Sequence, residues 1–213
     1  MLTFKMDTTE FDKVFKEYSN YSKRSFAESC NQHAFYIARN AVNVTKAADK
    51  NTISSKLSSP ARKYPGAPLA AILVNAELGN KGKKGLSGPK MATAISKYIK
   101  RMQSHVNFVR SGWIPAIKKL RFVVPNKGGT PIPSGTDKPG RNFGGAQPAI
   151  AGLNPTAYIW NSIWGSKKNK AGSSDKIEKI LQEGAQKAVD METQSMRDYI
   201  VRKQKEIIKQ TFG

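Results

Sequence analysis

Residues 174–209 read SDKIEKILQEGAQKAVDMETQSMRDYIVRKQKEIIK, and their apolar positions recur every three or four residues. That spacing places them on one face of an α-helix. Ser174 is a favourable N-cap, Asp175 and Glu178 would lie in the first turn, and lysines lie near the end, as the helix dipole prefers. Gly184 is an interior weakness that costs about 1 kcal/mol relative to alanine. The stretch predicts a long C-terminal helix with an apolar side formed by Ile177, Leu181, Ala185, Ala188, Met191, Met196, Tyr199, Ile200 and Ile207.

The N-terminal part of the chain shows the same spacing from residue 9 to about residue 48. No proline or glycine interrupts this stretch, and Thr9 with Asp12 resembles a capping box in which aspartate replaces the usual glutamate. We therefore expect a single amphipathic helix, about 60 Å long at 1.5 Å per residue. A compact domain of this size does not need such a length, so part of the helix would pack on a neighbouring molecule.

Shorter elements are expected between the two long helices. Residues 68–78, 89–102 and 113–120 are predicted to be helical, each with a proline in its first turn. β-branched and aromatic residues predict strands at residues 121–125 and 156–164. We expect these two strands to pair as a small antiparallel sheet.

Residues 125–155 carry 7 of the 17 glycines and 6 of the 11 prolines, with hardly any hydrophobic period. A stretch of this length without regular structure is unusual inside a compact domain. It is either a surface loop or an extended arm that becomes ordered on a neighbouring subunit or on DNA, and the sequence leaves both open. The whole pattern predicts an α+β fold, predominantly helical, with long N- and C-terminal helices packed with a small antiparallel sheet. We expect one single domain over residues 1–213.

The positive charge of the chain is concentrated in its middle. The net charge is +21, and residues 51–170 hold 20 basic side chains against two acidic ones, Glu77 and Asp137, a net of +18. The ends are nearly neutral, at +2 for residues 1–50 and +1 for residues 171–213. Concentrated positive charge attracts polyanions in a salt-dependent way. We interpret the middle as a surface for DNA, with an acidic protein, an anionic membrane and simple solubility as the alternatives.

The candidate contact residues are lysines and arginines between residues 81 and 170. Such side chains contact the phosphate backbone and carry no sequence preference by themselves. The run GNKGKKG at Gly79–Gly85 lacks the Gly-Lys-Ser/Thr ending of a phosphate loop and does not follow a predicted strand, so we interpret it as a basic turn. The candidates for contact with nucleic acid or an acidic partner are Lys81, Lys83, Lys84, Lys90, Lys100, Arg101, Arg110, Lys118, Lys119, Arg121, Lys127, Lys138, Arg141, Lys167, Lys168 and Lys170.

Side chains suited to catalysis are scarce. The chain has two histidines, His33 and His105, and one cysteine, Cys30. Cys30 and His33 form an isolated C-x-x-H pair, whereas a zinc site needs four ligands, so we interpret them as a buried cysteine beside a histidine on one helix. Metal-dependent phosphate chemistry needs clustered carboxylates, which the middle of the chain lacks. The sequence therefore predicts no catalytic residue, no metal and no cofactor, and an enzyme acting on an acidic polymer is the least favoured function.

The sequence gives no indication of a membrane protein. Its longest apolar run, Leu69–Val74, is far shorter than the roughly 20 residues that cross a bilayer. The N-terminus has no apolar core or cleavage site of a signal peptide, and a single cysteine cannot form an intrachain disulfide. We expect a chain that is made and kept in a reducing cytoplasm and has no membrane partner.

Three segments of the chain carry a family resemblance. The first is FVRSGWIPAIKKL, residues 108–120, which contains an R-x-G motif. The second is NPTAYIWNSIWG, residues 154–165, which contains an N-x-x-x-Y motif in a predicted strand that ends at a glycine. The third is QKAVDMETQSMRDYI, residues 186–200. In this order they resemble the neck, tail-completion or minor-tail proteins of tailed bacteriophages, over about half of the chain and through degenerate motifs. Residues 51–105 and 125–155 are longer than the pattern of that family, which leaves connector, stopper and tail completion open.

The resemblance implies a non-enzymatic virion structural protein, made in the host cytoplasm, with no catalytic residues to transfer. It would form a ring, often sixfold, at the head–tail junction around the DNA channel. Its partners would be further copies of itself, neighbouring portal, connector, terminator or tail-tube proteins, and DNA in the channel. A stand-alone nucleic-acid-binding accessory protein without sequence preference is the second hypothesis.

Overall fold

The structure, a computed structural model, describes residues 7–22, 24–47, 49–62, 64–79, 85–104, 106–124, 128, 131–133, 143–152, 155–162 and 174–212. It divides into two compact units: unit 1 comprises Met1–Lys46 and Phe108–Gly213, and unit 2 comprises Ala47–Asn107. The fold is α+β and predominantly helical, as the sequence predicts. A single domain over residues 1–213 stays a prediction, because compactness alone does not tell whether either unit folds independently.

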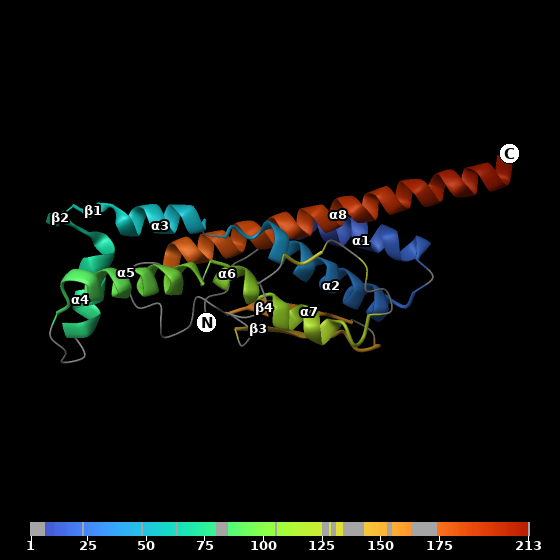
Figure 1. Ribbon diagram of the computed structural model, residues 1–213. Coiled ribbons are helices and arrows are strands. Elements are labelled where there is room, and N and C mark those ends of the chain that lie inside the picture. Colours follow the sequence, from blue (N-terminus) through green and yellow to red (C-terminus); the bar gives the residue numbers. More distant parts are fainter. Residues whose placement is uncertain are drawn as a thin grey trace. The chain divides into compact units, whose positions relative to one another are not determined.

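Unit 1 is built on the helices α1 (Thr9–Tyr21), α2 (Phe26–Val44) and α8 (Ser174–Phe212). The long helix α8 lies beside both α1 and α2 (Figure 1), and this confirms the predicted C-terminal helix. Its apolar face meets that of α2 because both carry small and branched residues every three or four positions. The main core includes Phe35, Ala38, Ala41, Val42, Leu181, Ala185, Ala188 and Val189, and a second cluster joins Val14, Phe15 and Tyr18 of α1 to Met196 and Ile200 of α8.

The prediction of one continuous helix from residue 9 to residue 48 is wrong. The helix ends at Tyr21, Ser22 has an extended backbone, and α2 begins after Ser25. Ser25 and Glu28 form a reciprocal capping box: the Glu28 amide donates to Ser25 Oγ at 3.2 Å, and the Ser25 amide donates to Glu28 Oε2 at 2.9 Å. Such a box satisfies two amides at the start of a helix, so α2 has its own start signal although no proline or glycine marks the break. The predicted capping box of Thr9 and Asp12 is also wrong. The N-cap of α1 is Thr8, whose hydroxyl donates to the Asp12 carboxylate but accepts no backbone amide of the helix.

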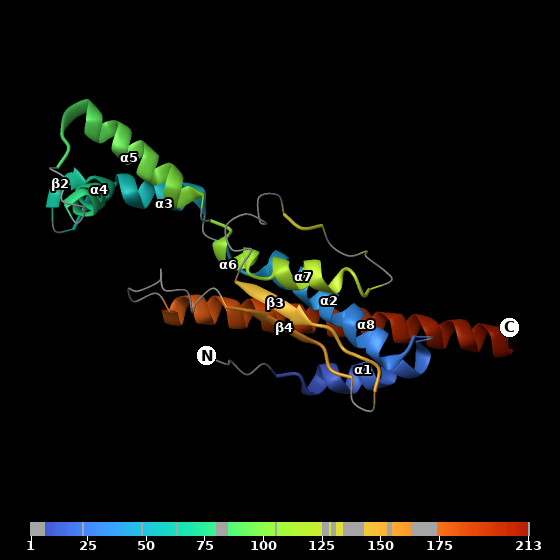
Figure 2. The ribbon, with the colours of Figure 1, turned by 90° about the horizontal axis from the view of Figure 1, so that it is seen from below.

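The remaining elements of unit 1 are two short helices, α6 (Phe108–Ser111) and α7 (Ile114–Leu120), and two strands, β3 (Gly144–Gln147) and β4 (Tyr158–Asn161). The strands are antiparallel, with Gly144 opposite Asn161, and β3 contacts α7 (Figure 2). Within the predicted strand 156–164, β4 is confirmed. The helix predicted at residues 113–120 is confirmed by α7.

The partner of β4 differs from the predicted one. Residues 121–123 form turns after α7, and the amides of Arg121, Val123 and Val124 donate back to carbonyls of α7, so none is available to a strand. Pro125 lies outside the described residues. The pairing strand β3 instead belongs to the segment 125–155 that we expected to be a loop. Its glycines admit close neighbours: a Cβ on Gly145 would lie 2.4 Å from the Trp160 ring.

Unit 2 contains α3 (Lys50–Ser58), β1 (Pro60–Ala61), β2 (Tyr64–Pro68), α4 (Leu69–Gly79) and α5 (Gly88–Gln103). The three helices pack on one another, and β1 pairs with β2 as an antiparallel hairpin. The helices α4 and α5 confirm the two helices predicted for this region. The helix α3, which the sequence analysis missed, begins where the Asp49 side chain accepts the Thr52 amide at 2.6 Å.

Candidate functional site

The segment with the R-x-G pattern is a structural joint of unit 1. Arg110 donates from Nε to the Thr45 carbonyl at 2.5 Å and from Nη2 to the Asn43 carbonyl at 3.3 Å, so it satisfies carbonyls at the end of α2. Trp113 Nε1 donates to Thr45 Oγ1 at 3.2 Å. Arg110 was a candidate for contact with DNA; because its guanidinium is used inside unit 1, we leave it out of the proposed contact surface.

A basic turn follows this joint at the end of α7. Lys118, Lys119 and Arg121 are all exposed there, as the sequence analysis requires of contact residues. Phe122 is 90% exposed in the same turn, and Val123 is exposed beside it. Cations beside an exposed aromatic ring form a combination that suits phosphates and unstacked bases. We call residues 118–123 the α7 turn, which is distinct from the basic turn predicted at Gly79–Gly85.

The helix α5 provides a second group of exposed cations, in unit 2. Lys90 and Lys100 are exposed, and so is Lys97, which was not among the predicted contacts. Spacings of seven and three residues place the three lysines on neighbouring positions of one helix side. Arg101 is engaged within the unit: it pairs with both carboxylate oxygens of Glu77, at 3.1 and 2.7 Å, and its guanidinium lies over the ring of Tyr98.

The charge of unit 2 as a whole is strongly positive. Ala47–Asn107 contain 11 basic and 2 acidic residues, a net charge of +9. The pair of Glu77 with Arg101 neutralises one of the two carboxylates locally. The other predicted contact residues, Lys81, Lys83, Lys84, Lys127, Lys138, Arg141, Lys167, Lys168 and Lys170, lie outside the described residues.

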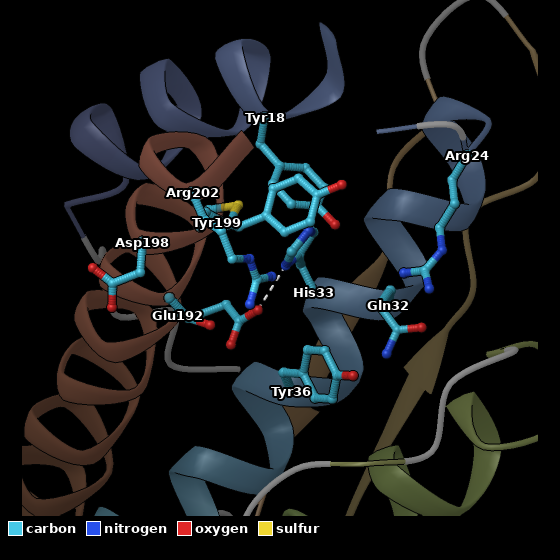
Figure 3. Close-up of a pocket in the computed structure, with 11 residues that line it drawn as sticks. Tyr18, Arg24, Gln32, His33, Tyr36, Glu192, Asp198, Tyr199 and Arg202 are labelled. Carbon is cyan, nitrogen blue, oxygen red and sulfur yellow. Dashed lines mark hydrogen bonds and ion pairs between the residues drawn. The ribbon is translucent and has the colours of Figure 1, made fainter. Parts of the chain in front are cut away.

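A polar cavity of about 390 Å³ lies in unit 1 beside α2 and α8. At its wall His33 Nδ1 is 2.6 Å from Glu192 Oε1, and both residues are almost fully buried, at 4% and 3% exposure (Figure 3). The Phe15 and Tyr18 rings each pack against the imidazole in a T-shaped arrangement. Burial raises the pKa of Tyr18, so its hydroxyl keeps its proton at neutral pH.

The cysteine of the C-x-x-H pair is a poor nucleophile. Burial raises the pKa of the Cys30 thiol, and its Sγ donates to the Pro155 carbonyl at 3.4 Å. The thiolate is the reactive form, so this environment disfavours reaction. Among the described residues no group of three or more histidine, cysteine, aspartate or glutamate side chains could hold a metal ion. We interpret the His33–Glu192 pair as an internal link between α2 and α8.

The last turns of α8 form a surface that the sequence analysis missed. We call residues 201–212 the C-terminal arm. Tyr21, where α1 ends, accepts a hydrogen bond from Gln204 at 3.2 Å, and α8 continues past this point (Figure 1). Val201, Ile208 and Phe212 are 47%, 57% and 85% exposed. Their spacing of seven and four residues places them on one side of the helix, a signal that was present in the sequence.

No family model matches the chain, and neither does a curated protein or a solved structure. The resemblance to bacteriophage neck and tail proteins therefore rests on the three quoted segments. In the part of the chain that the structure describes, no helix combines the length and apolar character that crossing a membrane requires.

Proposed function

We propose that the chain is a non-enzymatic structural subunit that associates with copies of itself and holds DNA without sequence preference. The C-terminal arm is the main support for this proposal, because its side chains Val201, Ile208 and Phe212 form an exposed apolar strip on one side of α8. Full burial of one such side chain contributes about 1.5–3 kcal/mol. A neighbouring copy that covers the arm would gain this free energy at each subunit, and a repeated surface pair of this kind forms a ring when the rotation between neighbours closes.

We further propose that the assembly is the head–tail junction of a tailed bacteriophage, where portal, connector, terminator or tail-tube proteins would be its neighbours. The family resemblance supports this placement, and the packing adds to it. Asn161 donates to the Val109 carbonyl at 2.9 Å, which joins the second resembling segment to the first. The third segment belongs to α8, which packs on α2, and the Arg110 contacts attach α2 to the first segment. All three segments thus belong to one packed unit.

Replacing Ile208 and Phe212 together by glutamate is expected to weaken self-association by about a hundredfold or more, because two apolar contacts become buried charges. Sedimentation across a concentration series measures this, and electron microscopy shows whether the wild type forms closed rings. Lys187→Glu is the matched control, since it changes the net charge equally at an exposed site of α8 outside the arm. A wild-type chain that stays monomeric and never enters a particle would remove the proposal.

For DNA, the net charge of +9 in unit 2 and the exposed lysines of α5 support contact with the phosphate backbone. Changing Lys90, Lys97 and Lys100 to glutamine is expected to reduce the salt dependence of binding, with a slope of log K against log salt that is smaller by up to about 2.7, or about 0.9 for each lost phosphate contact. Fluorescence anisotropy of a labelled duplex across salt concentrations measures the slope.

The control for this experiment changes Lys13, Lys16 and Lys187 to glutamine, which removes the same charge from α1 and α8 of unit 1. Equal losses in the two triple variants would mean that net charge alone drives binding and would contradict the contact surface on α5. Micromolar binding by a monomer with a steep salt slope would favour the second function, a stand-alone nucleic-acid-binding protein, which the charge of unit 2 also supports.

A further inference from the structure

The outer side of the strand β4 exposes two aromatic rings. Tyr158 and Trp160 are 56% and 39% exposed, and as residues two apart in a strand they point to the same side of the sheet. Ala157 and Ile159 alternate with them and pack against the main core of unit 1. The core therefore holds the strand from its inner side and leaves the two rings on the solvent side.

The Trp160 ring is held against the neighbouring strand β3. Gly145 is its cross-strand partner, and a Cβ there would lie 2.4 Å from Cζ2 and 2.8 Å from Cε2 of the indole. The indole therefore fills the space that a side chain at Gly145 would take, which restricts its movement. Gln147, the cross-strand partner of Tyr158, is exposed on the same side of the sheet. We call Gln147, Tyr158 and Trp160 the aromatic platform.

Exposed rings on a strand are suited to stack on planar groups. Residues two apart in a strand are separated by about 6.5 Å, so each ring of the platform can take one base of a single strand. The Gln147 amide offers a donor and an acceptor that can bond the edge of a base. In a duplex the base faces are stacked on one another, so this arrangement favours unpaired bases.

The charge of this part of the chain favours a polyanion over a neutral partner. The platform belongs to residues 51–170, whose net charge is +18. The helix α7 packs against β3 (Figure 2) and carries the exposed Lys118 and Lys119. A neutral sugar or an apolar protein surface gains nothing from these charges, whereas the phosphates of a nucleic acid are attracted by them.

We propose that the aromatic platform binds unpaired bases of single-stranded nucleic acid by stacking. Trp160 and Tyr158 each hold one base, Gln147 contacts a base edge, and the cations of unit 1 attract the phosphates. This site goes beyond the proposed function, because it lies in unit 1 and depends on stacking. It needs neither the C-terminal arm nor the lysines of α5, on which the proposed assembly and duplex contacts depend.

The test measures binding of the full chain to a short labelled single-stranded oligothymidylate by fluorescence anisotropy across salt concentrations. Trp160→Ala and Tyr158→Ala are each expected to raise the Kd by about fivefold to a hundredfold, the usual effect of losing one stacked base. Because neither ring carries a charge, the slope of log K against log salt should stay that of the wild type. Trp160→Phe keeps a ring and should retain most of the affinity. Binding of base-free polyphosphate should be the same in every variant.

Tyr64→Ala is the matched control, since Tyr64 is 55% exposed, much like Tyr158, but belongs to β2 of unit 2. Quenching of tryptophan fluorescence by the oligothymidylate, reduced in Trp160→Phe, reports the contact directly, because Trp113 is buried. Circular dichroism shows whether each variant folds.

An unchanged Kd in either alanine variant of the platform overturns the site, and so does an equal loss in Tyr64→Ala or with polyphosphate. A Trp160 signal that responds to protein concentration and not to oligothymidylate also overturns it, because a second copy would then cover the rings. Each of these results leaves the proposed self-association through the C-terminal arm and the duplex contacts of α5 unaffected.

Discussion

Gly112→Ala is expected to destabilise unit 1 by about 2–6 kcal/mol. A Cβ at this position would lie 2.2 Å from Oδ1 and 2.5 Å from Cγ of Asn161, a buried residue of β4. The Asn161 side chain would have to move and would lose its hydrogen bond to the Val109 carbonyl. Forcing extra volume into a packed site costs about 1–3 kcal/mol, and a buried polar group left without its partner costs about as much again. Urea unfolding followed by the fluorescence of the buried Trp113 measures the change.

Two variants make this prediction specific. Gly152→Ala is the control, because a Cβ there meets nothing within 4 Å, and it is expected to change stability by less than about 1 kcal/mol. Adding Asn161→Ala to Gly112→Ala removes the colliding atoms, so the double variant should be less destabilised than the sum of the two single variants. Strict additivity of the two changes would show that the close approach of Gly112 and Asn161 does not set the stability of this joint.

The helices that are predicted correctly from the sequence have either an apolar period over many turns or proline and glycine residues near their ends. The helix α8 is predicted because its apolar period continues over many turns, and α4 and α5 because proline and glycine mark their ends. The break before α2 has a local signal too, the S-x-x-E of Ser25 and Glu28, which a prediction based on the apolar period and on the absence of proline and glycine did not use. A capping box can therefore decide where a helix ends even when periodicity continues across it.

The elements that the sequence does not predict depend on contacts between distant residues. The strand β3 consists of Gly-Gly-Ala-Gln, which has low strand propensity, and it forms because β4 offers hydrogen bonds and the Trp160 ring packs on Gly145. Residues 121–124 have higher strand propensity, yet their amides are used by the turn after α7. Strand pairing is decided by available partners, and neither choice is visible in local composition.

The roles of the candidate site residues also depend on contacts between residues that are distant in the sequence. Exposure of Lys118, Lys119 and Arg121 is expected for charged residues, whereas the use of Arg110 inside unit 1 depends on carbonyls of α2 more than sixty residues away in the chain. The pairing of His33 with Glu192 likewise joins residues 159 positions apart. Local spacing pairs His33 only with Cys30, and it carries no signal for Glu192, the residue that His33 contacts in the fold.

Glu192→Ala is expected to destabilise unit 1 by about 3–5 kcal/mol, because removing one member of a buried pair leaves the other without compensation. His33 Nδ1 would then lose its acceptor, and because Nε2 already has no partner among the described residues, the ring would be buried between Phe15 and Tyr18 without that hydrogen bond. Glu192→Gln retains an acceptor oxygen for Nδ1 and should cost clearly less. Urea unfolding at constant pH compares the variants.

The surface pair of Arg197 with Glu10 provides the control, since the Glu10 side chain is largely exposed. Glu10→Ala is expected to cost less than about 1 kcal/mol, as for other solvent-screened ion pairs. The double variant His33→Leu with Glu192→Met tests whether the pair itself contributes to stability. Replacing both partners by apolar residues can be nearly neutral, because neither polar group is then left without its partner. If that double variant is as stable as the wild type, the hydrogen-bonded pair is not required for the packing of α2 on α8. A cost of Glu192→Ala as small as that of Glu10→Ala would mean that the buried pair does not hold α2 and α8 together.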